Sequence, residues 1–257
     1  FRQARAFNQP LSNWERVGST LANVADFSHM FDTAEAFNQP IGNWNTSGAI
    51  SMSYTFSANR IGGGDSVNMQ FNQPISAWDV SNVQDFSGMF YNARSSFASF
   101  NQPLNSWDTS SATNMSGMFQ YNHTDSANPF NQALPDWDVS GVTDLSDMFD
   151  ASDFDHSLET WDLNSTEVAL NNIFSSDGEM STENYSRSLA GFANSVDRND
   201  GPYGQTMAIS GQTYDATDYL ASGRFLNATD ARAFLTATKA VTVAGASNAT
   251  ADGEYVY

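Results

Sequence analysis

Apolar and polar residues recur along the first two-thirds of the chain in units of 24 to 34 residues. Each unit opens on Phe-Asn-Gln-Pro-Leu or a close variant, at Phe7, Phe37, Phe71, Phe100, Phe130 and Phe154. A tryptophan follows each of these phenylalanines by seven residues, at Trp14, Trp44, Trp78, Trp107, Trp137 and Trp161. In four units a second phenylalanine follows the tryptophan by twelve residues, in the last unit it follows by thirteen, at Phe174, and in the first unit it follows by seventeen, at Phe31. Residues 1–174 are therefore a tandem array.

The pattern inside one unit predicts a short strand and then a helical turn. Apolar residues at relative positions 0, 3, 5 and 8, close to the spacing of leucine-rich repeats, are Ile75, Trp78, Val80 and Val83. The Trp-x-Val segment has the alternation of a strand with both side chains inward. Phe86, Met89 and Phe90 then have the i, i+3, i+4 spacing of one or two helical turns.

One such coil cannot bury its apolar face alone, so neighbouring coils must share a core. The sequence predicts a repeat solenoid of the leucine-rich-repeat kind. Each coil would contribute one short parallel β-strand, with turns or short helices on the opposite face. Unit length varies only after the final phenylalanine, so insertions such as Ser57–Gln70 are expected along one edge of the stack.

The repeat ends near Ser175, and residues 175–257 have a different pattern. Apolar faces predict helices at Thr182–Asn194 and Ala228–Thr236, and β-forming runs predict strands at Thr206–Ser210 and Ala240–Ala244. We expect this small α+β segment to cap the open end of the solenoid, because repeat arrays require capping. A small separate domain docked on the array is the alternative.

Charge and composition narrow the set of partners. The 257 residues carry 29 acids against 10 bases, which gives a formal net charge of −19. A polyanion repels nucleic-acid phosphates and anionic lipids, so we expect no nucleic-acid partner. Membrane insertion is not expected either, because no apolar run approaches the roughly 20 residues of a span. Cysteine is absent, which excludes disulfides, thiol nucleophiles and thiolate metal sites.

The segment FNQPISAWDVSNVQDFSGMF, at Phe71–Phe90, resembles the repeat of about 25 residues in BspA-like leucine-rich-repeat bacterial surface proteins and lipoproteins. The resemblance covers residues 1–174, and Met180–Arg198 and Ala228–Ala246 look like the segment that follows such arrays. It implies a secreted or cell-surface protein, often large and modular and associated with adhesion. Because the chain starts in mid-array, we expect it to be a fragment, or the ordered part, of a longer protein. It carries over no catalytic residues. The long insertions and the acidity depart from simple members of that family.

An acidic column is the main candidate for ligand binding. The residue after the tryptophan is Asp79, Asp108, Asp138 or Asp162 in four units, and the next outward residue is Ser81, Ser110 or Ser140 in three. On strands about 4.8 Å apart these side chains would form an exposed ladder. Repulsion would raise some of the carboxyl pKa values unless a cation or hydrogen bonds intervene. The column would bind a cationic or polyhydroxylated ligand, or Ca²⁺. Local turns that each aspartate stabilises are the alternative explanation.

Two further columns have structural explanations. The asparagines of the Phe-Asn-Gln motif, expected to be buried and to join backbone groups of neighbouring coils, are Asn8, Asn38, Asn72, Asn101 and Asn131. The residues before the predicted helical turn, expected to cap its free N–H groups, are Asp26, Asp85, Asn114 and Asp144.

No grouping of residues indicates catalysis or a resident cofactor. His29, His123 and His156 occupy unrelated repeat positions, so a zinc site is not expected. The Gly62-Gly63-Gly64-Asp65 run lacks the lysine of a phosphate-binding loop, and no calcium loop is present.

The sequence therefore predicts a non-enzymatic extracellular recognition or adhesion module that binds a protein or a glycan. The alternative is a structural subunit or spacer of an extracellular filament, sheath or envelope layer. Its partners would then be copies of itself.

Overall fold

The computed structural model describes most of the chain, and all structural statements concern that part. It comprises residues 1–15, 21–58, 69–92, 99–121, 128–163, 168–174, 180–199, 206–208, 213–238, 242–244, 247–249 and 255–256. The Gly62–Asp65 run, His123 and most of the Ser57–Gln70 insertion lie outside these residues.

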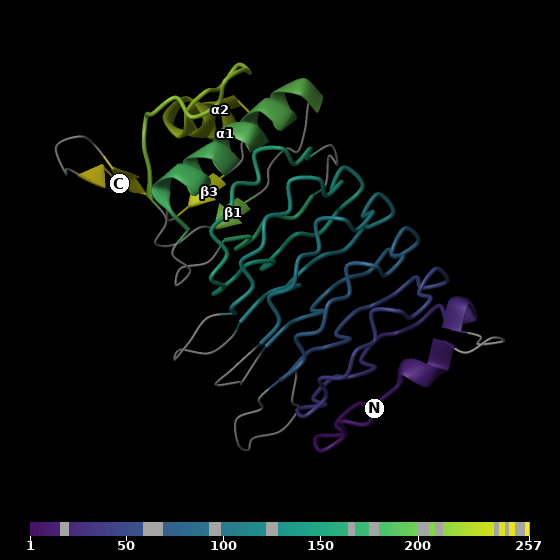
Figure 1. Ribbon diagram of the computed structural model, residues 1–257. Coiled ribbons are helices and arrows are strands. Elements are labelled where there is room, and N and C mark those ends of the chain that lie inside the picture. The colour runs from purple at the N-terminus through teal and green to yellow at the C-terminus, as the bar shows by residue number, and fades with distance from the viewer. Residues whose placement is uncertain are drawn as a thin grey trace.

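The repeats form a stack of coils that runs from the N-terminal end to helix α1 (Figure 1). Backbone hydrogen bonds join each coil to the next in a regular ladder. The N–H groups of Phe86, Gly88 and Phe90 donate to carbonyl oxygens of the following coil at 2.9, 2.8 and 2.9 Å. Parallel bridges also connect the coils, through Asp26, Ser51, Asp85, Asn114, Asp144 and Ala169 in turn.

This ladder does not lie where the sequence places the strand. Trp78–Val80 is not a strand in the structure, although both end residues are buried. The bridged residue of that coil is Asp85, which begins the segment with helical spacing. That segment is a run of turns and not a helix. Alternate N–H groups there donate to the next coil, so they are not available for the bonds within one helix.

One residue in each of these turn segments has a left-handed backbone conformation. The residue two positions before the final phenylalanine of each coil has a positive φ, between 52° and 59°. These residues are His29, Tyr54, Gly88, Gly117, Asp147 and Asn172. Gly88 has a second constraint, because an added Cβ would overlap the ring of Tyr54 from the preceding coil.

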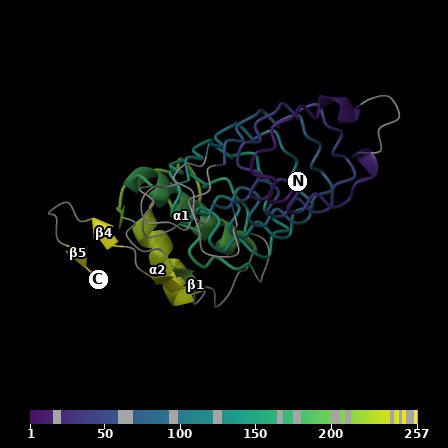
Figure 2. The same ribbon diagram turned by 90° about the horizontal axis from the view of Figure 1, so that it is seen from below.

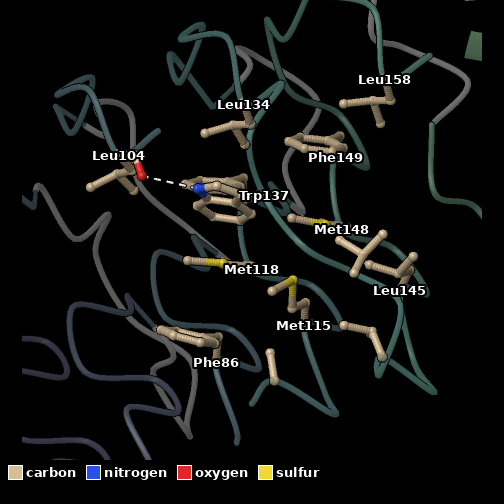
Figure 3. Close-up of a cluster of buried hydrophobic side chains, with 14 of the residues drawn as sticks. Phe86, Leu104, Met115, Met118, Leu134, Trp137, Leu145, Met148, Phe149 and Leu158 are labelled. Atoms are coloured by element: carbon tan, nitrogen blue, oxygen red, sulfur yellow. Dashed lines mark hydrogen bonds between the residues drawn. The ribbon is translucent and has the colours of Figure 1, made fainter. Parts of the chain in front are cut away.

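The core inside the coils consists of stacked aromatic rings. Phe31 and Phe37 stack at 4.1 Å, and equivalent pairs in later coils stack at 3.8 to 4.0 Å. The tryptophans form a second column, in which Trp137 lies 6.4 Å from the rings of both Trp107 and Trp161. The indole N–H of Trp137 donates to the Leu104 carbonyl oxygen at 2.9 Å (Figure 3).

The first residue of the chain occupies the position of a final phenylalanine. Phe1 stacks on Phe7 at 4.2 Å, as Phe31 stacks on Phe37. The segments FRQARAF and FDTAEAF align, and opposite charges pair between them. Arg2 lies 3.0 Å from Asp32, and Arg5 lies 3.0 Å from Glu35. The array pattern thus extends one partial coil before Phe7.

Two 3₁₀ turns, η1 (Ser12–Glu15) and η2 (Leu21–Asn23), belong to the first coils, and the remaining helices and strands follow the array. These are α1 (Thr182–Asn199), β1 (Thr206–Ala208), β2 (Thr213–Tyr214), α2 (Ala228–Thr238), β3 (Thr242–Ala244), β4 (Ser247–Ala249) and β5 (Tyr255–Val256). β1 pairs with β3 in parallel, with Met207 opposite Val243, while β4 lies between parallel β2 and antiparallel β5. Both predicted helices are present and extend further, and β1 and β3 lie within the two predicted strands.

Helix α1 covers the end of the stack, across the last coil (Figures 1 and 2). Ser188 accepts the Leu158 N–H at 2.9 Å, and Ser195 accepts the Leu163 N–H at 2.7 Å. The ring of Phe192 stacks on Phe174 at 6.4 Å and so continues the phenylalanine column into the helix. Helix α1 therefore provides the last coil with both hydrogen-bond partners and a ring-stacking partner.

Candidate functional site

Three aspartates of the acidic column lie on the exposed surface of the array, and each bonds to its own coil. The Asp108 carboxylate accepts the Ser110 N–H at 3.1 Å and the Ser110 hydroxyl at 2.6 Å. Asp79 makes the same two bonds with Ser81, at 3.1 and 2.7 Å. Asp138 accepts the Ser140 N–H at 2.9 Å. These turns fix the carboxylates in a row, one in each successive coil.

Asp162 departs from the row. It accepts the hydroxyl of Ser195 at 2.6 Å and lies 3.2 Å from Arg198, so α1 engages it. The exposed candidate surface is therefore the row of Asp79, Asp108 and Asp138 with their serines, which we call the acidic row.

Repulsion does not dominate the acidic row at Asp108. The hydrogen bonds from Ser110 lower the pKa of the Asp108 carboxyl below its ordinary value of 3.8, and burial opposes them only slightly. A raised carboxyl pKa is expected only where no hydrogen bond stabilises the charged carboxylate, and at Asp108 the bonds from Ser110 do so.

The Asp108 turn gives a prediction with a definite pH window. A lowered folded-state pKa means that the turn stabilises the fold above the unfolded pKa and loses that contribution as pH falls through the folded pKa. Asp108→Asn should therefore reduce the free energy of unfolding at pH 7 by less than about 1 kcal/mol, because the group is exposed. The loss should shrink as the pH falls below 3.8 and vanish once the pH is below the lowered folded-state pKa.

NMR titration of the Asp108 carboxyl carbon tests this directly. Its midpoint should lie below 3.8 in the wild type and move upward in Ser110→Ala, which removes the hydroxyl donor. A midpoint that does not move would show that Ser110 has no part in the shift.

The asparagine column joins coil to coil. Asn101 Oδ1 accepts the Asn131 N–H at 2.9 Å and the Gln132 side-chain amide at 3.0 Å. The same pair of hydrogen bonds recurs at Asn8, Asn38 and Asn72. Asn131 accepts the N–H of Asp155 at 3.0 Å. These side chains are half-buried or exposed, not buried as the sequence indicated, because they lie at the coil surface where the next coil begins.

The third column caps turns. Asp26, Asp85, Asn114 and Asp144 each accept the N–H of the serine two residues later, at 2.8 to 3.0 Å. These turns are not helical, so the residues start the coil-to-coil ladder instead of a helix. The column is structural in the same way as the asparagines.

Sequence reasoning missed a buried carboxylate. Asp32 is fully buried and accepts bonds from Arg2, from Ser57 at 2.8 Å and from Thr33 at 3.1 Å. His29 Nδ1 also lies 3.1 Å from it. These residues come from three successive coils, so Asp32 ties the first coils together. The opposite charges at matching positions of FRQARAF and FDTAEAF were the signal that could have shown this.

Metal ligands do not gather in the described part of the chain, where no three His, Asp or Glu side chains are placed to hold an ion. His156 Nε2 lies 3.3 Å from the Asn131 carbonyl oxygen, far along the array from His29. Among the described helices, none combines the length and apolar character needed to cross a membrane.

The repeated coils, with their internal ring stacks and asparagine ladder, define a tandem-repeat protein that displays a regular polar surface. A family described as "Mycoplasma protein of unknown function, DUF285" matches residues 1–124 and 67–186. These matches cover more than half of the chain, and the chain belongs to that family. No curated protein and no solved structure matches it.

Proposed function

We propose that this chain is a non-enzymatic recognition or adhesion module, secreted or displayed at the cell surface, which binds an extracellular protein or glycan. The resemblance of its repeat to BspA-like leucine-rich-repeat surface proteins supports the location and the role. The proposal also places the stack of coils in the leucine-rich-repeat class of solenoids.

The acidic row is the observation that carries the proposal. Its three carboxylates are exposed, repeat once per coil and are held in place by Ser81, Ser110 and Ser140. A surface that is already ordered loses less conformational entropy when a ligand binds. Carboxylates and hydroxyls in such a row suit a cationic segment of a protein or the hydroxyl groups of a glycan.

Binding without catalysis agrees with the equivalence of these sites. Asp79 and Asp108 have equivalent partners, Ser81 and Ser110, in the same geometry. A catalytic acid and base need different environments, and these two carboxylates have the same one. Ca²⁺ on this row remains a proposal with weaker support, since the described carboxylates do not form a group of three.

A binding screen tests the acidic row. The protein is applied to arrays of extracellular proteins and glycans, and any ligand found is titrated against the triple variant Asp79→Asn, Asp108→Asn, Asp138→Asn. We expect a loss of at least tenfold in affinity, which is about 1.4 kcal/mol.

A charge-matched control makes the result specific. Glu183→Gln, Asp218→Asn and Asp230→Asn remove the same charge from exposed positions outside the array. Equal loss of affinity in both variants would assign the effect to net charge. Turnover of the ligand by the wild type would contradict the proposal altogether.

The structural alternative, a filament or sheath subunit, has less support from the fold. Filaments formed by continued stacking need two open ends, and α1 already occupies the last coil through Ser188 and Ser195.

A further inference from the structure

A buried hydroxyl in the C-terminal part has no hydrogen-bond partner. Tyr185 lies in the first turns of α1, is fully buried, and its hydroxyl oxygen forms no hydrogen bond. Its ring meets Phe174 edge-on, with centroids 6.0 Å apart. The neighbouring Ser186 differs, because its hydroxyl accepts the Asp215 N–H at 3.2 Å. A buried polar group without a partner is rare and destabilising, so it calls for an explanation.

Positive charge lies close to this hydroxyl. Arg232 of α2 is half-buried, and its guanidinium carbon lies 5.7 Å from the ring centroid of Tyr214 in β2. Both residues act electrostatically on the Tyr185 phenol, but burial is the larger influence and raises the pKa of Tyr185 far above its ordinary value. The phenol therefore keeps its proton and is available as a donor.

A second buried hydroxyl belongs to the same helix as the arginine. Thr229 Oγ1 is buried and has no hydrogen-bond partner. Thr229 stands three residues before Arg232, so the two side chains share a face of α2. Helix α1 packs against both α2 and β2; α1 carries the phenol, and α2 carries the hydroxyl and the guanidinium.

We propose that one small monovalent anion, with chloride as the simplest case, binds beside the Tyr185 hydroxyl where α1 packs against β2 and α2. Tyr185 would donate its O–H to the anion and Arg232 would balance its charge. A guanidinium is a donor only, and an anion needs donors alone. A water molecule in the same place would also need acceptors for its own two hydrogens. This site is separate from the acidic row and independent of the proposed function.

The sign of one substitution tests the site. If the Tyr185 hydroxyl has no partner, Tyr185→Phe removes a buried unpaired group and should raise the melting temperature. If an anion is bound there, the same change should lower the melting temperature in NaCl by about 3 °C. The full chain is melted in NaCl and in sodium gluconate at equal ionic strength, because gluconate is too large to enter. The wild type should melt higher in chloride, and Tyr185→Phe should melt equally in both salts.

Tyr219→Phe is the matched control, since that hydroxyl already donates to Asp215 at 3.0 Å. It should change the melting temperature by the same amount in both salts. Arg232→Gln should abolish the preference for chloride, and it decides the question if Tyr185→Phe does not fold. A higher melting temperature for Tyr185→Phe would overturn the proposal. An equal decrease in both salts would also overturn it, in favour of a bound water.

Discussion

Trp137→Ala is expected to lower the free energy of unfolding by about 4–5 kcal/mol, at the upper end of the range for large-to-small changes in a core. Trp137 is 3% exposed and stacks between the rings of Trp107 and Trp161. Met118, Leu134 and Met148 surround it in Figure 3. The substitution leaves a cavity that rigid neighbouring coils cannot close, and it leaves the Leu104 carbonyl oxygen without the indole N–H. Urea denaturation followed by far-ultraviolet circular dichroism measures the loss.

Trp14→Ala is the control from the same column. Trp14 stacks on Trp44 at 5.5 Å but is 39% exposed, because only one of its faces is covered by a neighbouring tryptophan. Its removal should reduce the free energy of unfolding by no more than about 1–2 kcal/mol. If both variants lost the same amount, stacking within the column would not be the source of stability.

Gly191→Ala is expected to destabilise the protein by about 2–3 kcal/mol, although alanine favours a helix over glycine by about 0.5–1 kcal/mol. Gly191 lies in the middle of α1, where an added Cβ would overlap the backbone of Glu159 in the last coil. The helix would have to move away, and its contacts through Ser188, Ser195 and Arg187 would weaken. Arg187 is bound to Glu159 at 2.6 Å.

Hydrogen exchange of the α1 amides measures this directly, with urea denaturation beside it. Protection of α1 should fall in Gly191→Ala while protection in the central coils stays unchanged. Glu183→Ala, on the exposed side of the same helix, should leave both unaffected. A more stable Gly191→Ala protein would mean that α1 does not pack on Glu159.

The contacts between neighbouring coils could be predicted from the sequence, one repeat position at a time. Phenylalanine, asparagine and tryptophan recur at fixed offsets, and residues at one offset meet in adjacent coils because every coil has the same path. The residue types then determine the contact: Asn38 bonds to Asn8, and Trp44 stacks on Trp14. The class of repeat to which these coils belong stays a prediction.

The position of the ladder could not be predicted from the same offsets. Phe86, Met89 and Phe90 have the spacing of a helix, but a left-handed residue inside the segment gives a similar spacing to a chain of turns. Glycine would have indicated this conformation, and Gly88 and Gly117 are the only two glycines among the six described residues of that column. His29, Asp147 and Asn172 are of types that tolerate it but do not require it, and Tyr54 gives no such signal; the contact with the next coil imposes it.

In the candidate site, the residues of the acidic row were predictable and their partners were not. Asp79 and Asp108 directly follow their tryptophans in the sequence, but only the structure shows that Ser81 and Ser110 bond to them. Tyr185 gave no signal of its own. A tyrosine on the apolar face of a predicted helix is expected in a core, and the isolation of its hydroxyl depends on residues from β2 and α2.

The coil-to-coil ladder also gives the array an electrostatic direction. At the described junctions, N–H groups such as those of Phe27, Phe86 and Leu145 point toward the C-terminal end, and a smaller series of bonds, such as Thr113 N–H to Gln84 oxygen, runs the opposite way. Peptide dipoles that largely cancel in an ordinary sheet therefore cancel only in part here and leave a net dipole along the stack. The N-terminal end acquires partial negative charge, and Arg2 and Arg5, the arginines that the structure describes in the array, lie there. Glu159 and Asp162 lie at the positive end, beside α1. A charged ligand moving along the stack meets a field that changes sign, and this field favours one orientation of the ligand over the other.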